Sequence, residues 1–323
     1  MTASNSQNDD GNETMQDRFN DMEHRNWEQG YEAYDQGFGP LTRQTIPTLL
    51  RNAGFPSASS SSGEGRPIRI LDVATGPGFV LSAAVDAAVM SSTQSESAHQ
   101  ESFHLMGIDI TQNFLKLAEQ RINAQLQEQT QQSKQIKVDF VEGSAESLPF
   151  PENTFDSIVC NFGILHFFNP DTFLRESYRV LRPGGKVSFS AWAPPTKTEG
   201  FRIALESIGE AGNPNVEGLP EGPNFFDYGD SEQAVSVLRE IGFEEMSSVE
   251  LNEMKWENVN DAGMLYNVLL NGTSRTREVL LGQNPEETYA VQSLLAVKYN
   301  AVTDGGKRPL AMPALVTSGQ KPL

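Results

Sequence analysis

The stretch ILDVATGPGF, Ile70–Phe79, decides the fold. An apolar run ends in an acid and passes directly into a glycine-containing turn, and the helix-like GFVLSAAVDAAV follows. A strand, a tight turn and a helix in this order bring backbone N–H groups up to a ligand. Gly76 and Gly78 have no Cβ, so they permit unusual dihedral angles and let a ligand approach the backbone. The stretch therefore predicts a ligand site at the end of a buried strand.

The composition of this turn argues against two common ligands. A dinucleotide-binding turn has the pattern G-x-G-x-x-G/A, whereas GPGFVL from Gly76 onward lacks the last small residue. A phosphate-binding loop needs a lysine after its second glycine, and none is present here. The carboxylate of Asp72 would also repel a pyrophosphate. It suits a ligand that carries a cationic amine.

Strand and helix patterns alternate around this turn. Strand patterns cover residues 68–74, 103–110, 136–143, 155–162 and 185–192, and helical patterns separate most of them. This alternation predicts a parallel sheet, which binds ligands beyond the carboxyl ends of its strands. Asp109 ends the second strand, where a carboxylate suits the two hydroxyls of a ribose. Thr111 is equally able to cap the helix that follows, which frees Asp109 for a ligand.

The bulk composition excludes several functions. The 323 residues carry a formal net charge of −19, which argues against binding to nucleic acid or to anionic membranes. Cys160 is the single cysteine, so no internal disulfide forms, and we expect it to be a small buried hydrophobe. The four histidines show no metal-ligand spacing. No long apolar span or targeting peptide is evident, so we expect a soluble, cytoplasmic protein without a metal; the oligomeric state stays open.

The chain divides into four segments. We expect a disordered acidic tail over residues 1–27, followed by an N-terminal helical lid and a flexible linker over 28–66. Residues 67–193 carry the strand–helix alternation and form the ligand-binding core. Residues 194–323 are expected to complete the sheet and to supply segments that cover the substrate, with residues 258–306 mostly helical.

Four motifs in order give the chain a specific resemblance. They are DVATGPGF, GIDI, GSAESLPFPENTFD and RVLRPGGK, within residues 67–192. This order resembles the class I S-adenosylmethionine-dependent methyltransferases, in the small-molecule branch similar to the quinone-biosynthesis C-methyltransferases. The resemblance implies a Rossmann-like α/β fold, with a mostly parallel seven-stranded sheet flanked by helices. It also implies an N-terminal helical lid and a C-terminal helical insertion before the last strand.

The resemblance also implies which residues bind S-adenosylmethionine. Gly76 and Gly78 would hold its methionine end, Asp109 its ribose, and Ile110 and Ala145 would flank its adenine. Ser144 stands where the family usually has an acid, and its hydroxyl is still able to accept a bond from the adenine amino group. The complete expected set is Asp72, Ala74, Gly76, Gly78, Asp109, Ile110, Ser144, Ala145 and, near the methionyl group, Asn161. Asp156 and the turn at Arg182–Gly185 are interpreted as structural.

The acceptor side is defined by fewer signals. Aromatic residues of the lid and of the segment after the fifth strand are candidates for the substrate pocket, or are simply core: Tyr31, Tyr34, Phe38, Trp192, Phe225 and Phe226. His166 follows the fourth strand and is a candidate general base. A lone histidine in an apolar stretch is more often a packed residue bonded to the backbone.

The sequence therefore predicts a methyltransferase that transfers a methyl group from S-adenosylmethionine to a small apolar or aromatic, specialised metabolite by in-line displacement. One alternative is a regulatory, partner-binding protein with a methyltransferase-like fold, and a stable partner together with an empty cofactor site would favour it. An NAD(P)-dependent oxidoreductase is disfavoured, since the chain has no Tyr-x-x-x-Lys or similar hydride-transfer set. A protein methyltransferase stays open. The acceptor molecule and its reacting atom (C, N, O or S) are not defined by the sequence.

Overall fold

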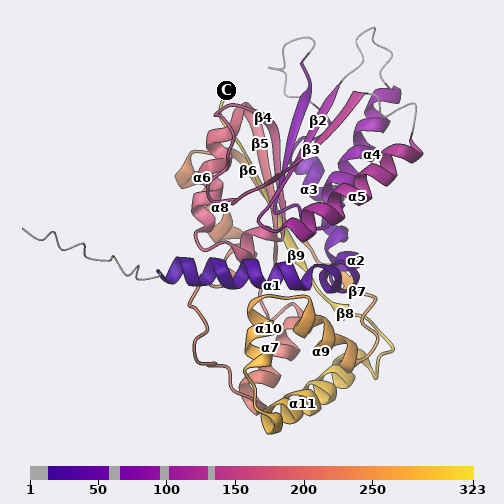
Figure 1. Ribbon diagram of the computed structural model, residues 1–323, viewed down its shortest axis with the longest axis vertical. Coiled ribbons are helices and arrows are strands. Elements are labelled where there is room, and N and C mark those ends of the chain that lie inside the picture. Colours follow the sequence, from indigo (N-terminus) through magenta and orange to yellow (C-terminus); the bar gives the residue numbers. More distant parts are fainter. Residues whose placement is uncertain (1–13, 58–65, 95–101, 130–134) are drawn as a thin grey trace, which may run out of the picture.

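The computed structural model describes residues 14–57, 66–94, 102–129 and 135–323. Within these residues the main sheet has seven strands in the order β3-β2-β1-β4-β5-β9-β6, and it forms the upper half of the molecule in Figure 1. The strands are β1 (Ile68–Val73), β2 (Phe103–Asp109), β3 (Ile136–Glu142), β4 (Phe155–Asn161), β5 (Leu181–Trp192), β6 (Glu244–Leu251) and β9 (Ala314–Gln320).

Strand pairing in this sheet is parallel from β3 through to β5. Only β9 runs the other way, and it pairs antiparallel with both β5 and β6. The mostly parallel, seven-stranded Rossmann-like fold expected from the sequence is therefore confirmed. The order reverses between the neighbours β1 and β4, which is where open parallel sheets bind ligands.

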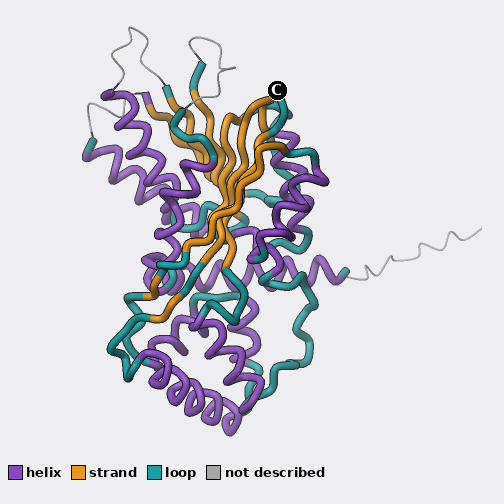
Figure 2. The backbone as a smooth tube through the Cα atoms, turned by 180° about the vertical axis from the view of Figure 1, so that it is seen from behind, coloured by secondary structure: helices purple, strands orange, loops and turns teal. Residues whose placement is uncertain are grey.

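Helices cover both faces of the sheet (Figures 1 and 2). One face carries α3 (Ile46–Asn52), α4 (Phe79–Gln94) and α5 (Gln112–Glu128), and the other carries α6 (Pro170–Val180) and α8 (Ser231–Ile241). Phe173, Ser177 and Val180 form the buried face of α6, as their helical spacing predicts. Each face thus has its own buried apolar core.

The N-terminal helix α1 (Met15–Gly37) begins earlier than the sequence predicted. The expected tail extended to residue 27, and this is wrong for residues 14–27, whereas residues 1–13 and the linker residues 58–65 lie outside the described ranges. Thr14 accepts a hydrogen bond from the Asp17 N–H at 3.1 Å, and Asp17 accepts one from the Thr14 N–H at 3.0 Å. This capping box starts the helix. Its buried apolar side chains include Phe19, Met22 and Trp27.

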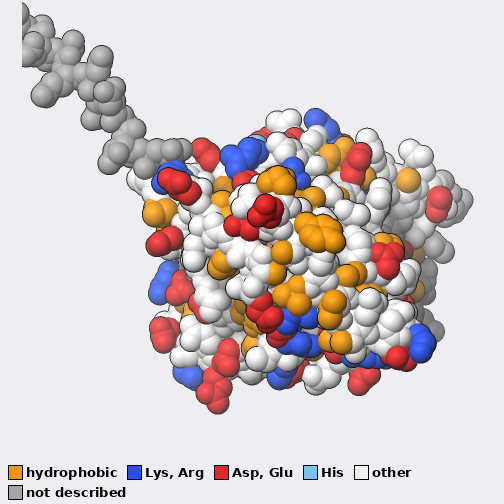
Figure 3. Space-filling view, turned by 90° about the horizontal axis from the view of Figure 1, so that it is seen from below, with side chains coloured by type: hydrophobic (Ala, Val, Ile, Leu, Met, Phe, Trp, Pro, Cys, Tyr) orange, Lys and Arg blue, Asp and Glu red, His pale blue; other side chains and the backbone are white. Residues whose placement is uncertain are grey.

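A helical cap lies beyond the carboxyl ends of the strands (Figure 1). It consists of α7 (Glu199–Ala211), α9 (Ala262–Asn271), α10 (Arg275–Leu281) and α11 (Pro285–Thr303), with the short strands β7 (Lys255–Trp256) and β8 (Leu310–Ala311). Its last three helices form the predicted insertion before the final strand β9. Helix α1 crosses between the sheet and this cap, followed by α2 (Gly39–Thr42) and the 3-10 turn η1 (Arg43–Thr45). The outer surface of the cap end mixes apolar with acidic and basic side chains (Figure 3).

Asp156 ties three strands together near their amino ends. Its carboxylate accepts hydrogen bonds from both terminal nitrogens of Arg66, at 2.8 and 2.7 Å, from Arg182 at 2.8 Å and from the Arg69 N–H at 2.9 Å. Burial raises the pKa of the Asp156 carboxyl, but the bonds from Arg66 and Arg69 outweigh burial and hold the pKa below its usual value. The structural role expected for Asp156 agrees with this position.

We expect Asp156→Asn to lower the free energy of unfolding by about 2 kcal/mol, because it leaves two arginines without their counter-charge. The loss is smaller than for a fully buried pair, since the Arg66 and Arg182 side chains keep 26% and 21% exposure. Urea denaturation of both proteins measures it. Asp139→Asn is the control, because the Asp139 side chain is 36% exposed and such pairs contribute about 1 kcal/mol or less. Equal losses in the two variants would contradict the prediction.

Candidate functional site

A cavity of about 870 Å³ lies where the sheet, α1 and the helical cap meet. Its floor consists of the residues that follow the strand ends, at positions 74–77, 109–110, 143–146 and 161–163. Its other walls come from α1, from α7, from the loop around residues 222–226, and from the start of α10. The cavity therefore joins the predicted ligand site to the cap at the point where the strand order reverses.

The turn after β1 has an unusual backbone. Ala74, Gly76 and Gly78 all have positive φ, at 54°, 50° and 79°, and a non-glycine residue in this region is strained. Ala74 and Gly76 line the cavity as expected. Gly78 is not among the lining residues. A Cβ at Gly78 would lie 2.8 Å from that of Ala118, so this glycine lets α4 approach α5 closely.

Asp109 lies at the centre of the floor. Its Oδ2 accepts the Gly76 N–H at 2.9 Å, and its Oδ1 accepts the N–H and the hydroxyl of Thr111 at 3.0 and 2.9 Å. Thr111 makes no side-chain cap bond to α5, so its hydroxyl serves Asp109 instead of the predicted cap. Burial raises the pKa of Asp109, although these bonds act against it.

Asp72 lies behind the turn and is not among the residues that line the cavity. Its side chain is 1% exposed, its Oδ2 accepts the Thr75 hydroxyl at 2.6 Å, and its Oδ1 has no hydrogen-bond partner. Burial raises the pKa of the Asp72 carboxyl to about 7, and the neighbouring Asp109 charge adds to the rise. The Asp72 carboxylate therefore lies behind the residues that line the cavity, whereas the sequence suggested that it contacts the ligand directly.

Asn161 connects the lid to the sheet. Its Oδ1 accepts the hydroxyls of Thr45 and Ser190 at 2.6 and 2.7 Å, and its Nδ2 donates to the Thr42 carbonyl at 3.1 Å. Asn161 lines the cavity, but these bonds already engage both ends of its amide. Neighbouring Cys160 is fully buried outside the lining, and burial raises the pKa of its thiol.

The remaining cofactor candidates line the cavity beside β2 and β3. They are Ile110, Ser144 and Ala145. Ala145 is buried, and the exposed Ser144 hydroxyl accepts the Glu146 N–H at 3.2 Å. Their places next to a flat ring and its polar edge stay a prediction.

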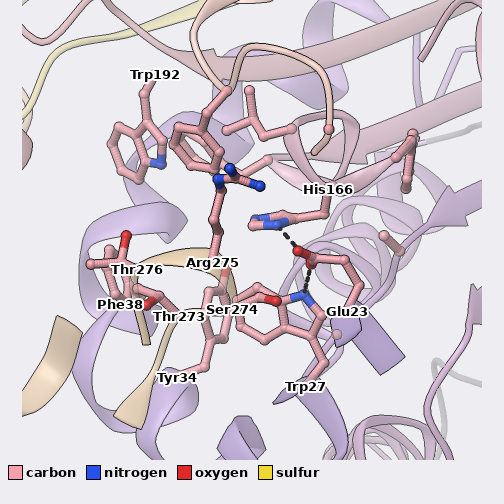
Figure 4. A pocket seen from close by; sticks show the side chains of 18 of the residues that line it. Glu23, Trp27, Tyr34, Phe38, His166, Trp192, Thr273, Ser274, Arg275 and Thr276 are labelled. Carbon is pink, nitrogen blue, oxygen red and sulfur yellow. Dashed lines mark hydrogen bonds and ion pairs between the residues drawn. The ribbon is translucent and has the colours of Figure 1, made fainter. Parts of the chain in front are cut away.

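Aromatic side chains form another wall of the cavity, and Tyr34, Phe38 and Trp192 are labelled in Figure 4. Tyr34 stacks on Phe38 at 5.8 Å, and Phe38 stacks on Phe201 at 6.3 Å. Phe201 continues to Phe225 and Phe226, at 5.8 and 5.9 Å between ring centroids. Five of the six predicted aromatic candidates line the cavity: Tyr34, Phe38, Trp192, Phe225 and Phe226.

Tyr31, the sixth aromatic candidate, has a different place. It is not among the lining residues, and its hydroxyl donates to Glu32 at 3.0 Å in an exposed part of α1.

A pair of ionisable side chains faces the same cavity from two elements. Glu23 of α1 lies 3.1 Å from Nδ1 of His166, on the 3-10 turn η3 (Gly163–His166), and also accepts the Trp27 indole N–H at 2.7 Å (Figure 4). Glu23 and Trp27 were missed because the sequence placed them in a disordered tail. The pattern Thr14-x-x-Asp17 was the available signal for an earlier helix start.

Arg275, at the start of α10, also reaches the cavity (Figure 4). Its guanidinium donates to the Pro220 carbonyl at 2.6 Å. No motif in the sequence distinguished this arginine. Among the described residues there is no group of His, Cys, Asp or Glu that could hold a metal ion. No described helix is long and apolar enough to cross a membrane.

The raised pKa of Asp72 makes stability depend on pH. Between about pH 4 and pH 7 the unfolded chain ionises this carboxyl while the folded chain keeps its proton, so stability is lost as pH rises. We expect Asp72→Asn to remove this loss, and hence to gain stability relative to wild type over that range, by about 1.4 kcal/mol per pKa unit. Urea denaturation near both ends of the range measures the difference.

Asp139→Asn provides the opposite control for this pH dependence. The hydrogen bond from Lys137 holds the pKa of Asp139 below its usual value, so this carboxylate stabilises the fold above its unfolded-state pKa and loses that effect as pH falls. A stability difference between Asp72→Asn and wild type that stays constant with pH would contradict the assignment.

Comparison with known proteins identifies a family that matches the segment of the chain containing the floor of the cavity. Residues 71–189 match the family described as "Methyltransferase domain". A demethylmenaquinone methyltransferase of Deinococcus radiodurans is 36% identical over 129 residues, which are 40% of this chain and 45% of that protein. A ubiquinone/menaquinone biosynthesis C-methyltransferase of Rhodopseudomonas palustris is 36% identical over 120 residues, or 37% and 40% of the two chains. The chain thus spans less than half the length of these curated relatives.

A solved structure shares the fold. The phosphoethanolamine N-methyltransferase 2 of Haemonchus contortus, in complex with phosphomonomethylethanolamine and S-adenosylhomocysteine, superimposes with a TM-score of 0.51 at 18% identity. The superposition covers 94% of this chain and 60% of that one. The comparisons confirm the resemblance drawn from the four motifs: residues 71–189 match a methyltransferase domain, and this part of the chain is similar to the quinone-biosynthesis methyltransferases.

Proposed function

We propose that this protein transfers a methyl group from S-adenosylmethionine to a small apolar or aromatic acceptor, in the biosynthesis of a specialised metabolite. One observation carries the proposal. The carboxylate of Asp109 lies at the Gly76 turn, at the switch point of a sheet whose residues 71–189 match a methyltransferase domain. This arrangement suits an adenosine ribose, and residues 72–79 contain no lysine or arginine for a pyrophosphate. Arg121 of α5 lies beside the turn, but it donates to the Pro77 carbonyl and pairs with Asp35.

The residues on the floor of the cavity fit the cofactor. Asp109 would accept the ribose hydroxyls, and Ile110 and Ala145 would flank the adenine. The backbone of residues 74–76 would face the methionine end. Asp72 has a buried Oδ1 without a partner, and a cation bound on the other side of the turn would stabilise its ionised form. An orphaned carboxylate oxygen in this position suits a ligand that carries both an ammonium and a sulfonium.

The bound cofactor supplies a methyl group that is already activated on a sulfonium, so the protein's own contribution is alignment and the exclusion of water. Helix α1 and the cap close over the floor and provide both. The wall from Tyr34 through Phe38 and Phe201 presents aromatic rings to the space beside the cofactor residues. Such a wall favours a flat, apolar acceptor over a small charged one.

The identity of the acceptor is set outside the matched segment. The family match ends at residue 189, whereas Phe201, Phe225 and Phe226 follow it and Trp27 and Tyr34 precede it. The relatives are named for demethylmenaquinone and for ubiquinone and menaquinone biosynthesis, and the flat ring of a quinone agrees with the aromatic wall. We therefore propose an acceptor with a flat, apolar ring.

The cofactor assignment is tested at Asp109. We expect S-adenosylhomocysteine to bind in the micromolar range, and Asp109→Ala to weaken binding about 10- to 100-fold, because a hydrogen bond to a charged acceptor contributes about 1.5–3 kcal/mol. Isothermal titration calorimetry measures both. Glu142→Ala is the matched control, since Glu142 ends the neighbouring strand, bonds Gln112 at 2.9 Å and lies outside the lining. Binding of NADH without binding of S-adenosylhomocysteine would refute the proposal.

The acceptor class is tested by a luminescent assay for S-adenosylhomocysteine over a panel of phenols, aromatic amines, thiols and quinone precursors. We expect turnover with an aromatic acceptor and none with small aliphatic amines, because the wall offers rings and few charges. Cofactor binding without turnover, together with a stable protein partner, would instead favour the regulatory alternative.

A further inference from the structure

We propose that Glu23 of α1 positions His166 as the proton acceptor of the reaction, so that the acceptor molecule reacts through an atom that loses a proton. This inference rests on the proposed methyl transfer and adds to it a base and the residue that orients the base. It rests on the contact between Glu23 and His166 in the wall of the cavity. Glu23 belongs to helix α1, which lies outside the matched methyltransferase domain.

The hydrogen bonds of Glu23 define which ring nitrogen of His166 carries a proton. The Glu23 side chain is buried, with a relative exposure of 3%. Its Oε2 accepts the Trp27 indole N–H at 2.7 Å and lies 3.1 Å from Nδ1 of His166. An ionised carboxylate only accepts hydrogen bonds, so Nδ1 must be the donor. Nε2 of the neutral ring then holds a free electron pair.

Aromatic contacts hold the imidazole in this orientation. The ring lies 4.8 Å from Trp27 and 5.5 Å from Phe225, edge to face in both cases. Within the described part of the chain, Nε2 has no protein hydrogen-bond partner. The His166 side chain is 24% exposed and lines the cavity. Nε2 is therefore the end of the ring left for a bound acceptor.

Other groups in the cavity are less suited to take a proton. Burial raises the pKa of the Tyr34 hydroxyl to about 12, so this phenol stays protonated. Asp109 already accepts three hydrogen bonds, and Glu146 accepts the Asn169 N–H. Of the other charged or titratable lining groups, Asp21 and His24 are exposed on α1, and the Arg275 guanidinium has no acceptor atom.

The proposed step moves one proton. Nε2 of His166 takes the proton from the acceptor's O–H, N–H or S–H group, and the electron pair of that bond stays on the acceptor. That pair forms the new bond to the methyl carbon, while the pair of the broken carbon–sulfur bond stays on sulfur. His166 is then an imidazolium, which the Glu23 carboxylate stabilises until the proton passes to solvent. Glu23 acts through His166 and does not touch the acceptor.

A purely structural role for the pair predicts different behaviour. If Glu23 only fastened α1 to η3, its replacement would loosen the cavity and weaken binding of acceptor and cofactor together. A positioning role predicts a loss in kcat, with KM and cofactor affinity unchanged. The two roles are therefore separated by the kinetic constants.

The first measurement is the tautomer of His166 in the full-length, ¹⁵N-labelled protein, read from long-range ¹H–¹⁵N correlation spectra and assigned with His166→Gln. It needs no turnover. We expect the proton on Nδ1 and an unprotonated Nε2 in the neutral ring. A dominant Nε2–H tautomer would overturn the inference. Where the probe below is not methylated, the kinetic comparison uses the acceptor that turns over in the panel of the preceding subsection.

The second measurement is methylation of 1-naphthol by wild type, Glu23→Gln, Glu23→Asp and the control Glu32→Gln, which makes the same chemical change at an exposed site of the same helix. We expect Glu23→Gln to lower kcat about 100-fold, in the range for loss of general-base catalysis. Glu23→Asp should recover part of that loss, and Glu32→Gln should match wild type. Equal kcat in Glu23→Gln and Glu32→Gln would overturn the inference, as would a parallel loss of S-adenosylhomocysteine affinity in Glu23→Gln.

Calorimetry with S-adenosylhomocysteine separates this inference from the proposed function. Absence of binding to wild type refutes methyl transfer itself, and with it the role of the pair. Binding and turnover in wild type with an unaffected Glu23→Gln variant refute only the role of Glu23.

Discussion

The site depends on the carboxyl ends of β1 and β4, where the chain leaves the sheet in opposite directions. These strands are parallel neighbours, and the connections that follow them lead to opposite sides of the sheet. Ala74 and Phe162 follow them directly, and both adopt positive φ, at 54° and 61°. Two strained residues at adjacent strand ends are retained only where the surrounding packing fixes them. The cavity opens beside these two strand ends, and Asp109, Asn161 and His166 all line it.

Helix α1 converts this crevice into a cavity. It is bound to the core through Asp35, which pairs with Arg121 at 2.7 Å, and to the cap through the Gly37 carbonyl, which accepts the Trp256 indole N–H at 2.9 Å. The pair is partly exposed and contributes little. The fully buried Trp256 contributes more, because its indole is both packed and hydrogen-bonded. The helix is thus fixed from both sides. Near Glu23, the Glu28 carbonyl accepts the Asn113 side chain of α5 at 3.0 Å, and Asn26 donates to Ser274 of the cap at 3.4 Å.

The strands and the floor of the site could be predicted because their signals are local. Short runs rich in apolar residues mark the strands of the core, and three of these strands, β2, β3 and β4, end at a polar residue: Asp109, Glu142 and Asn161. The resemblance then assigned the neighbours of Asp109. The exact hydrogen bonds could not be predicted. The Thr111 hydroxyl is able to cap α5 or to bond Asp109, and it bonds Asp109 because the Gly76 N–H holds that carboxylate within reach. Likewise, Gly78 serves helix packing that depends on Ala118.

The start of α1 and two lining residues of the cap, Phe201 and Arg275, were not predicted. The start of α1 was missed for a different physical reason. The buried face of α1 includes Glu23 and Asn26, which are polar residues and weaken the apolar periodicity that signals a packed helix. Their burial is stable because each finds a partner far away in sequence, His166 for one and Ser274 for the other. Sequence patterns register hydrophobic burial and miss polar burial of this kind. Sequence patterns therefore miss buried polar residues more easily than buried apolar ones.

The electrostatics of the floor select the sign of the ligand charge. Asp72 and Asp109 are both buried, and burial raises the pKa of each; the Asp109 charge also raises that of Asp72. Two carboxylates near each other in a poorly solvated site disfavour full ionisation of both. A cationic ligand relieves this repulsion, whereas an anionic ligand increases it. The two acids therefore favour a ligand with a sulfonium and an ammonium over a pyrophosphate. The backbone N–H groups of the glycine turn do not by themselves select a positive ligand.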